Sequence, residues 1–152
     1  MPRIFVRSFN VPAEAIDEIG HANNIEYVRW MQEIATAHSA AQGWPLARYV
    51  AGGAGWFVRS HAIDYLRPAF AGEAISLFTW VAEFSRSTSR RKYLFYRARD
   101  DEVLARAETL WVFVNLRSGA PARITEALRS AFDVVADEGE ALRLARAVGV
   151  TS

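Results

Sequence analysis

One long amphipathic segment constrains the fold of this chain more than any other feature. Asn23, followed three residues later by Glu26, forms a variant of the capping box that begins many helices. Beyond it, apolar residues recur at helical spacing up to Gly43, namely Tyr27, Val28, Trp30, Met31, Ile34, Ala35, Ala37 and Ala41. They cover more than one narrow stripe, which predicts a helix that a sheet wraps around.

Five strand-like segments accompany this helix. Residues 3–11 alternate between polar and apolar side chains and end before Pro12, which predicts a first strand. Four further strands with short connections are expected at residues 56–66, 74–84, 91–99 and 103–115. Asp100 and Asp101 indicate a tight turn between the last two strands. The order strand, long helix, four strands predicts an α+β domain in which one antiparallel sheet covers one helix.

The length of the chain predicts one domain. Its 152 residues are 51% hydrophobic, which is enough to bury a sizeable core. Residues 124–135 predict a C-terminal helix, and residues 138–148 predict another helix or a frayed tail. With no internal repeat or linker, we expect a single domain over residues 1–152, with its core at about 3–132.

Composition excludes several classes of function. The net charge is +1, from 18 positive and 17 negative residues, so there is no electrostatic reason to expect binding to nucleic acid or to an anionic membrane. The chain has no cysteine, which excludes disulfides, thiolate catalysis and cysteine metal sites. It has no signal-like segment and no run of roughly 20 apolar residues that would span a bilayer. We therefore expect a cytoplasmic protein that binds small molecules or other proteins.

Polar groups gather just before the long helix. Asp17 lies in the preceding loop, and Gly20, His21 and Asn23 follow it. A helix start offers unpaired N–H groups and a partial positive charge, which suit an oxygen that gains negative charge. A carboxylate beside such donors could act on the carbon that bears this oxygen. This segment is our candidate active site.

Two motifs together resemble a known family. The first is Asp17-x-x-Gly20-His21-x-Asn23-Asn24-x-x-Tyr27, and the second is Ile63-Asp64-Tyr65-Leu66-Arg67-Pro68, with Gly72-Glu73 at the following turn. In this order of elements they are similar to the hot-dog fold acyl-CoA thioesterases of the 4-hydroxybenzoyl-CoA thioesterase type. The resemblance covers residues 3–132. It implies a five-stranded hot-dog sheet and hydrolysis of an acyl-CoA thioester to a free acid and coenzyme A, with no metal or redox cofactor.

The resemblance also implies roles for the first motif. Asp17 would be the nucleophile or the general base, because an aspartate is ionised at neutral pH. The backbone N–H of Asn24 would donate to the thioester carbonyl oxygen. The other motif residues would shape the loop, brace the site or line the acyl pocket: Gly20, His21, Asn23 and Tyr27. Without a catalytic role, Asp17 would be a loop aspartate that accepts hydrogen bonds from nearby N–H groups.

One position departs from the family pattern. Many similar sequences have a glutamate where this chain has Gln32, and the carboxylate here is at Glu33, about 100° around the helix. Glu33 is a conceivable alternative base, although a solvated or ion-paired helix residue is the simpler interpretation. We favour Asp17.

A basic segment is a candidate site for the phosphates of coenzyme A. Residues 85–92 combine hydroxyl side chains with Arg86, Arg90, Arg91 and Lys92 at an expected connection between strands. Arginine is well suited to bidentate phosphate recognition. The alternative is a solvated basic hairpin.

Histidines offer weaker candidates. His61 and Arg59 are expected on one face of the second strand, where His61 could reach the substrate, although polar residues on an outer sheet face are common. His21, His38 and His61 lack close metal-ligand spacing, so we expect no metal site. The acyl specificity would depend on residues such as Met31, Ile34 and Trp56.

Unpaired sheet edges indicate self-association, because pairing with a second copy removes exposed strand edges. We expect a homodimer or homotetramer, and the resemblance implies an active site at the subunit junction. The thioester partner could be acyl-CoA or an acyl-carrier protein. Two other functions stay open: a hydratase or dehydratase that pairs Asp17 with His21, and a non-catalytic acyl-CoA-binding module.

Overall fold

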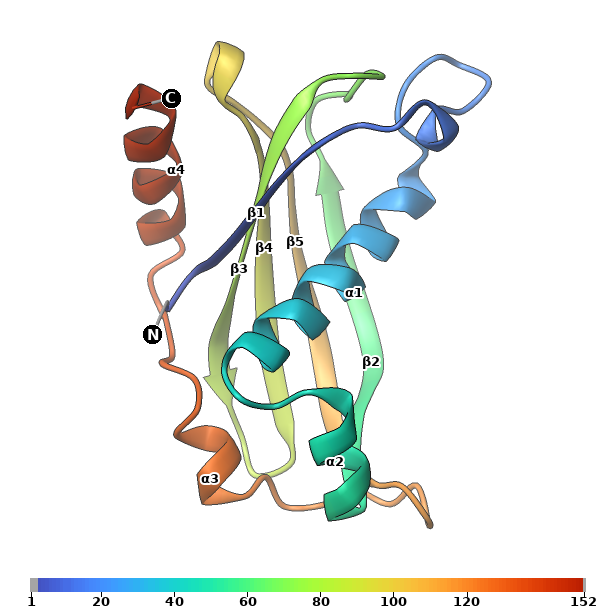
Figure 1. Ribbon diagram of the computed structural model, residues 1–152, viewed down its shortest axis with the longest axis vertical. Coiled ribbons are helices and arrows are strands. Elements are labelled where there is room, and N and C mark those ends of the chain that lie inside the picture. Colours follow the sequence, from blue (N-terminus) through green and yellow to red (C-terminus); the bar gives the residue numbers. More distant parts are fainter. Residues whose placement is uncertain (1–2, 152) are drawn as a thin grey trace.

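A five-stranded antiparallel sheet and one long helix form the centre of the protein (Figure 1). The computed structural model describes residues 3–151. Its strands are β1 (Phe5–Asn10), β2 (Ala54–Tyr65), β3 (Ala74–Phe84), β4 (Thr88–Arg97) and β5 (Glu102–Asn115). Its α-helices are α1 (Asn24–Ala41), α2 (Leu46–Gly52), α3 (Glu126–Arg129) and α4 (Gly139–Thr151). Two short 3-10 turns lie at Ala13–Ala15 and Ala98–Asp100.

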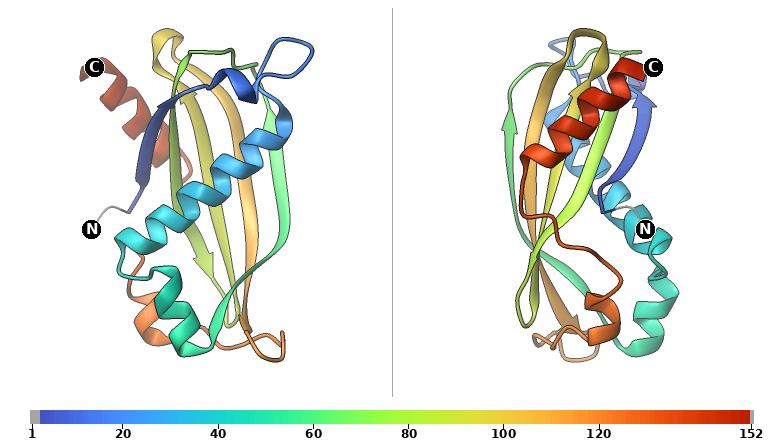
Figure 2. Two further views of the ribbon diagram at one scale, coloured as in Figure 1. Left: turned by 45° about the vertical axis from the view of Figure 1, so that its right-hand side comes forward. Right: turned by 90° about the vertical axis from the view of Figure 1, so that its left-hand side faces the viewer.

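The sheet has the strand order β1-β3-β4-β5-β2, and every pairing between neighbouring strands is antiparallel. The helix α1 runs diagonally across one face, which we call the inner face (Figures 1 and 2). This arrangement confirms the predicted hot-dog architecture of one sheet around one helix. The strands β1 and β2 form the two edges of the sheet.

The helix α1 is held by a cap at its start and by burial along one side. The side chain of Asn23 accepts a hydrogen bond from the N–H of Ile25 at 3.0 Å, which confirms the predicted cap. One side of the helix is buried at positions three or four residues apart, namely Tyr27, Trp30, Met31, Ile34, Ala35 and His38. The main core forms where this side meets inner-face residues, among them Ile75, Leu77, Tyr93 and Phe95.

A second, smaller core lies on the outer face of the sheet. Ala141 and Ala145 of α4 are fully buried against a cluster that includes Phe78, Trp80 and Leu94. Small residues on this side of the helix bring α4 close to β3 and β4 (Figure 2). Trp80 is therefore a core residue, and the C-terminal segment is a packed helix and not a frayed tail.

Three of the differences between the predicted and observed elements concern the basic segment and the short helices. The fourth strand begins at Thr88 instead of residue 91, so the basic segment lies largely inside β4. The predicted helix at 124–135 is wrong for most of its length, because only Glu126–Arg129 is helical. The helix α2 was not predicted. It begins after Pro45 and ends at Gly53, whose φ of 74° is left-handed. Within residues 3–151, no helix is long and apolar enough to cross a membrane.

Replacement of Ile34 by alanine tests the dependence of the fold on α1. Ile34 has no exposed surface, so Ile34→Ala leaves a cavity and is expected to lower the free energy of unfolding by about 2–5 kcal/mol. Ile25→Ala is the matched control, because Ile25 lies on the same helix but is 68% exposed, and its effect should stay within about 0.5 kcal/mol. Urea denaturation followed by circular dichroism measures both. Equal losses of unfolding free energy in the two variants would contradict the burial of Ile34 in the core.

Candidate active site

The loop before α1 is a compact turn closed by its own backbone. An isolated bridge joins Ile16 to Ala22, and the N–H of Asp17 donates to the carbonyl of His21 at 2.9 Å. Inside it, the N–H of Gly20 donates to the carbonyl of Asp17 at 3.1 Å. Gly20 has a φ of 98°, a conformation that glycine adopts without strain. Gly20 therefore allows the tight turn of this loop.

The carboxylate of Asp17 is fixed by this turn. Its Oδ1 accepts a hydrogen bond from the N–H of Ile19 at 2.9 Å, and its Oδ2 lies 3.7 Å from Nδ1 of His21. The side chain of Asp17 is 24% exposed and that of His21 is 35% exposed. One carboxylate oxygen thus holds the loop, while the other faces a histidine at the protein surface. A carboxylate in this position can act on a group that approaches from solvent.

The start of α1 offers a backbone donor beside this loop. The side chain of Asn23 accepts a hydrogen bond from the N–H of Ile25. The backbone carbonyl of Asn23 accepts one from the N–H of Glu26 at 3.0 Å. The N–H of Asn24 makes no hydrogen bond to any residue within 3–151. Because it is the first residue of the helix, it has no intrahelical acceptor. It is therefore available to an oxygen that carries negative charge.

The two sequence motifs meet at a pocket of about 160 Å³ at this helix start. Its walls come from the first motif and from the end of β2 with the following loop: His21, Ala22, Asn24, Tyr27, Tyr65, Leu66, Arg67 and Pro68. The hydroxyl of Tyr65 donates to the carbonyl of Asn24 at 3.0 Å, which ties the two walls together. Arg67 adds a cation to the rim; its side chain is 61% exposed, and its Nε lies 3.7 Å from Oε2 of Glu102.

Tyr27 lines this pocket with an uncharged phenol. Its ring is buried and packs edge-on against Tyr65, with ring centroids 5.0 Å apart. Burial raises the pKa of Tyr27 to about 12, so its phenol keeps its proton at neutral pH. Tyr27 is thus one of the residues that line the pocket beside Asn24.

An ion pair holds the loop that carries the second motif. Arg97 donates to both oxygens of Glu73, at 2.9 and 3.1 Å, and to the carbonyl of Pro68 at 3.3 Å. Glu73 also accepts from the N–H of Phe70 at 2.7 Å. Sequence analysis did not identify Arg97. The only signal was an arginine that follows the apolar run Tyr93–Tyr96 at the end of β4, and the structure shows that it positions one wall of the pocket.

The basic segment does not form the predicted phosphate site at this pocket. The prediction that Arg90 and Arg91 lie in a connection between strands is wrong, because both belong to β4 and face opposite sides of the sheet. Arg91 is buried, whereas Arg90 forms ion pairs with Glu83 and Glu108. Only Arg86 lies in the exposed turn, at the opposite end of the sheet from the start of α1 (Figure 1).

The remaining candidates also lie away from the pocket. His61 faces the inner side of the sheet, where its Nδ1 lies 2.8 Å from Oγ1 of Thr109, and burial lowers its pKa below 6.5. Arg59 lies at a β-bulge, so the regular alternation of β2 does not place it on the same face as His61. Glu33 is exposed and lies nine positions after Asn24, or about 14 Å along the helix.

The predicted acyl-pocket residues separate into two groups. Met31 and Ile34 are fully buried in the main core and line neither pocket. Trp56 lines a second, larger cavity near the far end of α1, together with Trp111, which was not among the predicted acyl-pocket residues. Within residues 3–151, no group of three or more His, Asp or Glu side chains is placed to hold a metal ion.

The comparison with family models gives one match. The model described as "Thioesterase-like superfamily" matches residues 11–132, which include both motifs, the helix α1 and the four strands β2 to β5. No curated protein matches the chain.

Several solved structures have a similar fold at low sequence identity. A 1,4-dihydroxy-2-naphthoyl-CoA thioesterase from Synechocystis has 19% identity and a TM-score of 0.77, over 84% of this chain and 94% of that chain. A protein from Staphylococcus aureus solved in complex with CoA has 13% identity and a TM-score of 0.79, over 84% and 80%. A DHNA-CoA thioesterase from Staphylococcus aureus has 18% identity and a TM-score of 0.75, over 97% and 94%. At these identities, the similarity establishes the shared fold.

Replacement of Gly20 by alanine tests the turn that holds Asp17. No atom lies within 4 Å of the position of an added Cβ, so the cost of Gly20→Ala comes from the left-handed φ alone, and we expect about 1–2 kcal/mol of destabilisation. Gly52→Ala is the matched control. Its Cβ would also meet open space, but its φ is not left-handed, and it lies in α2, where alanine is favoured by about 0.5–1 kcal/mol. Chemical denaturation should give effects of opposite sign; the same sign would rule out strain at Gly20.

Proposed function

Because this chain belongs to the thioesterase-like superfamily, we propose that it hydrolyses an acyl-CoA thioester to a carboxylic acid and free coenzyme A. The observation that carries the proposal is that one short segment, the loop before α1 and the first residue of that helix, holds two groups, although Asp17 itself is not among the residues that line the pocket. The two groups are the carboxylate of Asp17, held at the protein surface, and the open N–H of Asn24. They are the two groups that acyl transfer from a thioester requires.

In this proposal, the N–H of Asn24 binds the thioester carbonyl oxygen. Negative charge develops on that oxygen when the carbonyl carbon is attacked, and the positive end of α1 stabilises it. Asp17 then acts in one of two ways. It removes a proton from an attacking water, or it attacks the carbon itself to form an anhydride that water hydrolyses. In both routes the C–S bond breaks, and the thiolate of coenzyme A leaves and takes up a proton.

The substrate class follows from the pocket and from the related structures. Two of the related structures are named as thioesterases of a naphthoyl-type CoA ester, and another was solved with CoA. The rim residue Arg67 offers a cation for a phosphate of coenzyme A, in place of the three arginines expected from the sequence. An acyl-CoA ester accounts for these features without an acyl-carrier protein, and its use as a substrate implies a cytoplasmic location.

We further propose that the active form is a homodimer joined along β2. This edge strand has twelve residues and pairs with β5 on one side only. A long unpaired edge readily accepts another strand. Antiparallel pairing of two such edges around a two-fold axis would place the end of β2 at Tyr65 beside the partner copy. The pocket at the start of α1 would then lie at the subunit junction.

Replacement of Asp17 by asparagine tests the catalytic role. The asparagine side chain still offers an oxygen to the N–H of Ile19, so Asp17→Asn should fold normally but lose about 10²–10⁴-fold in kcat, a range typical of a lost acid–base group. Glu18→Gln removes an adjacent, exposed carboxylate and should leave kcat unchanged. Release of free thiol from a panel of acyl-CoA esters measures turnover. Binding without thiol release by the wild-type protein would favour a non-catalytic acyl-CoA-binding module, and hydration of an enoyl-CoA would favour a hydratase.

Replacement of Ser60 by lysine tests the proposed dimer. Ser60 lies near the middle of β2, so a two-fold axis would bring the two introduced lysines of Ser60→Lys close together, and their repulsion should weaken association several-fold. Ser8→Lys places the same charge on the other edge strand, β1, and should have no such effect. Sedimentation velocity over a range of concentrations measures the dissociation constant. A wild-type monomer at all concentrations would exclude the dimer.

A further inference from the structure

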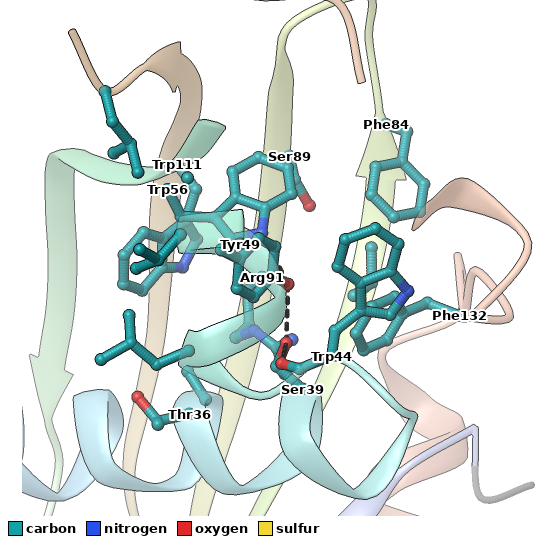
Figure 3. Close-up of a pocket in the computed structure, with 16 residues that line it drawn as sticks. Thr36, Ser39, Trp44, Tyr49, Trp56, Phe84, Ser89, Arg91, Trp111 and Phe132 are labelled. Atoms are coloured by element: carbon teal, nitrogen blue, oxygen red, sulfur yellow. Dashed lines mark hydrogen bonds between the residues drawn. The ribbon is translucent and has the colours of Figure 1, made fainter. Parts of the chain in front are cut away.

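A second cavity, larger than the pocket at the start of α1, lies far from Asp17. It has a volume of about 230 Å³ and is enclosed by the C-terminal part of α1, by α2, and by the inner face of the sheet (Figure 3). Thr36, on its wall, lies twelve positions after Asn24, or about 18 Å along the helix. Six aromatic side chains line it: Trp44, Tyr49, Trp56, Phe84, Trp111 and Phe132. This surface suits an apolar or aromatic ligand.

One charged side chain reaches this cavity from β4. Arg91 lines the cavity and is only 6% exposed. Its Nη1 lies 2.8 Å from Nδ1 of His38 and 3.2 Å from Oγ1 of Thr79. Because a guanidinium can only donate, Nδ1 of His38 must be an acceptor and therefore carries no proton. Neither His38 nor Thr79 therefore supplies a negative charge to Arg91.

The positive charge of Arg91 lacks a counter-charge within the described part of the chain. No Asp or Glu side chain of residues 3–147 forms an ion pair with it, and burial lowers its pKa. Arginine nevertheless keeps its proton in proteins. The other well-buried arginine, Arg97, is in contrast paired with Glu73 and Asp100. A buried charge without a partner is costly, so this arrangement favours an anion that comes from outside the chain.

The polar groups around Arg91 also leave room for such an anion. Both of its hydrogen bonds to described residues leave from Nη1, so Nε and Nη2 remain available for a two-point contact. Two of the hydroxyls that line the cavity are already engaged: Ser39 donates to the carbonyl of Trp44 at 2.8 Å and lies 2.7 Å from the hydroxyl of Tyr49 (Figure 3). Arg91 is therefore the group in this cavity that is best placed to recognise a ligand.

We propose that this cavity binds a carboxylate attached to an apolar or aromatic body, and that Arg91 binds the carboxylate. A planar guanidinium matches the two oxygens of a carboxylate, and the surrounding rings would enclose the body of the ligand. Two kinds of molecule could supply this carboxylate and its apolar body. The first source is a free organic acid, and the second is the acyl group of a substrate that carries a second carboxylate.

The second source rests on the proposed thioesterase function and on the proposed dimer. Antiparallel pairing of two β2 strands would place the Ala54 end of one copy, which borders the cavity, beside the Tyr65 end of the other copy. The cavity of one subunit would then lie near the helix start of its partner. An acyl group held at the partner's helix start could extend its far end toward Arg91. Binding of a free acid requires neither of these proposals.

Calorimetric titration with phenylacetate and its neutral analogue phenylacetamide tests the cavity directly. In the wild-type protein, phenylacetate should bind at least tenfold more tightly, a difference that corresponds to about 1.4 kcal/mol. Arg91→Gln should abolish this preference. Arg90→Gln, one position away on the outer face, should keep it, because Arg90 is paired with Glu83 and Glu108. If Arg91→Gln fails to fold, the affinities of the wild-type protein for phenylacetate and phenylacetamide still test the proposal. Equal binding of the two compounds, or no binding of phenylacetate, would overturn the proposal.

Thiol release then distinguishes the two sources. A wild-type preference in kcat/KM for 4-carboxybenzoyl-CoA over benzoyl-CoA, lost in Arg91→Gln and kept in Arg90→Gln, would identify the acyl group as the ligand. Binding of phenylacetate without such a preference would identify a free acid. No hydrolysis of any ester would contradict the proposed function but not the cavity, because the phenylacetate titration does not depend on turnover.

Discussion

Burial of one side of α1 against the inner face of the sheet is the interaction on which the rest of the structure depends. Met31 and Ile34 are fully buried there, and the packing fixes both the axis and the start of the helix. Because the start is fixed, the loop of Asp17 and the N–H of Asn24 keep their places beside Tyr65. The far end of the same helix closes the cavity that Arg91 enters. The position of α1 thus determines both the pocket at its start and the cavity at its far end.

The central elements could be predicted because their patterns are long. The predicted strand at 74–84 agrees with β3 at both ends, since its alternation is regular and turns bound it. The seven residues of α2 and the single turn of α3 give too little periodicity to distinguish a helix from a loop. The start of β4 was misplaced because its first residues are polar or charged, and such residues are typical of a turn.

The candidate site was predictable where it is local in the sequence. The cap by Asn23 and the turn at Gly20 depend on neighbouring residues, so the motif contains them. The ion pair of Glu73 with Arg97 joins residues 24 positions apart, and no local pattern indicates it. The burial of Arg91 was equally hidden, because only the pairing of β4 within the sheet decides which face of the strand a side chain occupies. A sequence shows the charge of a side chain but not its surroundings.

The donor that we propose at the start of α1 belongs to the backbone and not to a side chain. Every residue except proline supplies the same N–H, so substitution at position 24 leaves this donor in place as long as the helix begins there. Side chains that line the two pockets, such as Arg67 near this donor and Trp56 in the distant cavity, are not bound by that requirement. Over evolutionary time, a protein built in this way can exchange one ligand preference for another while the helix start persists unchanged.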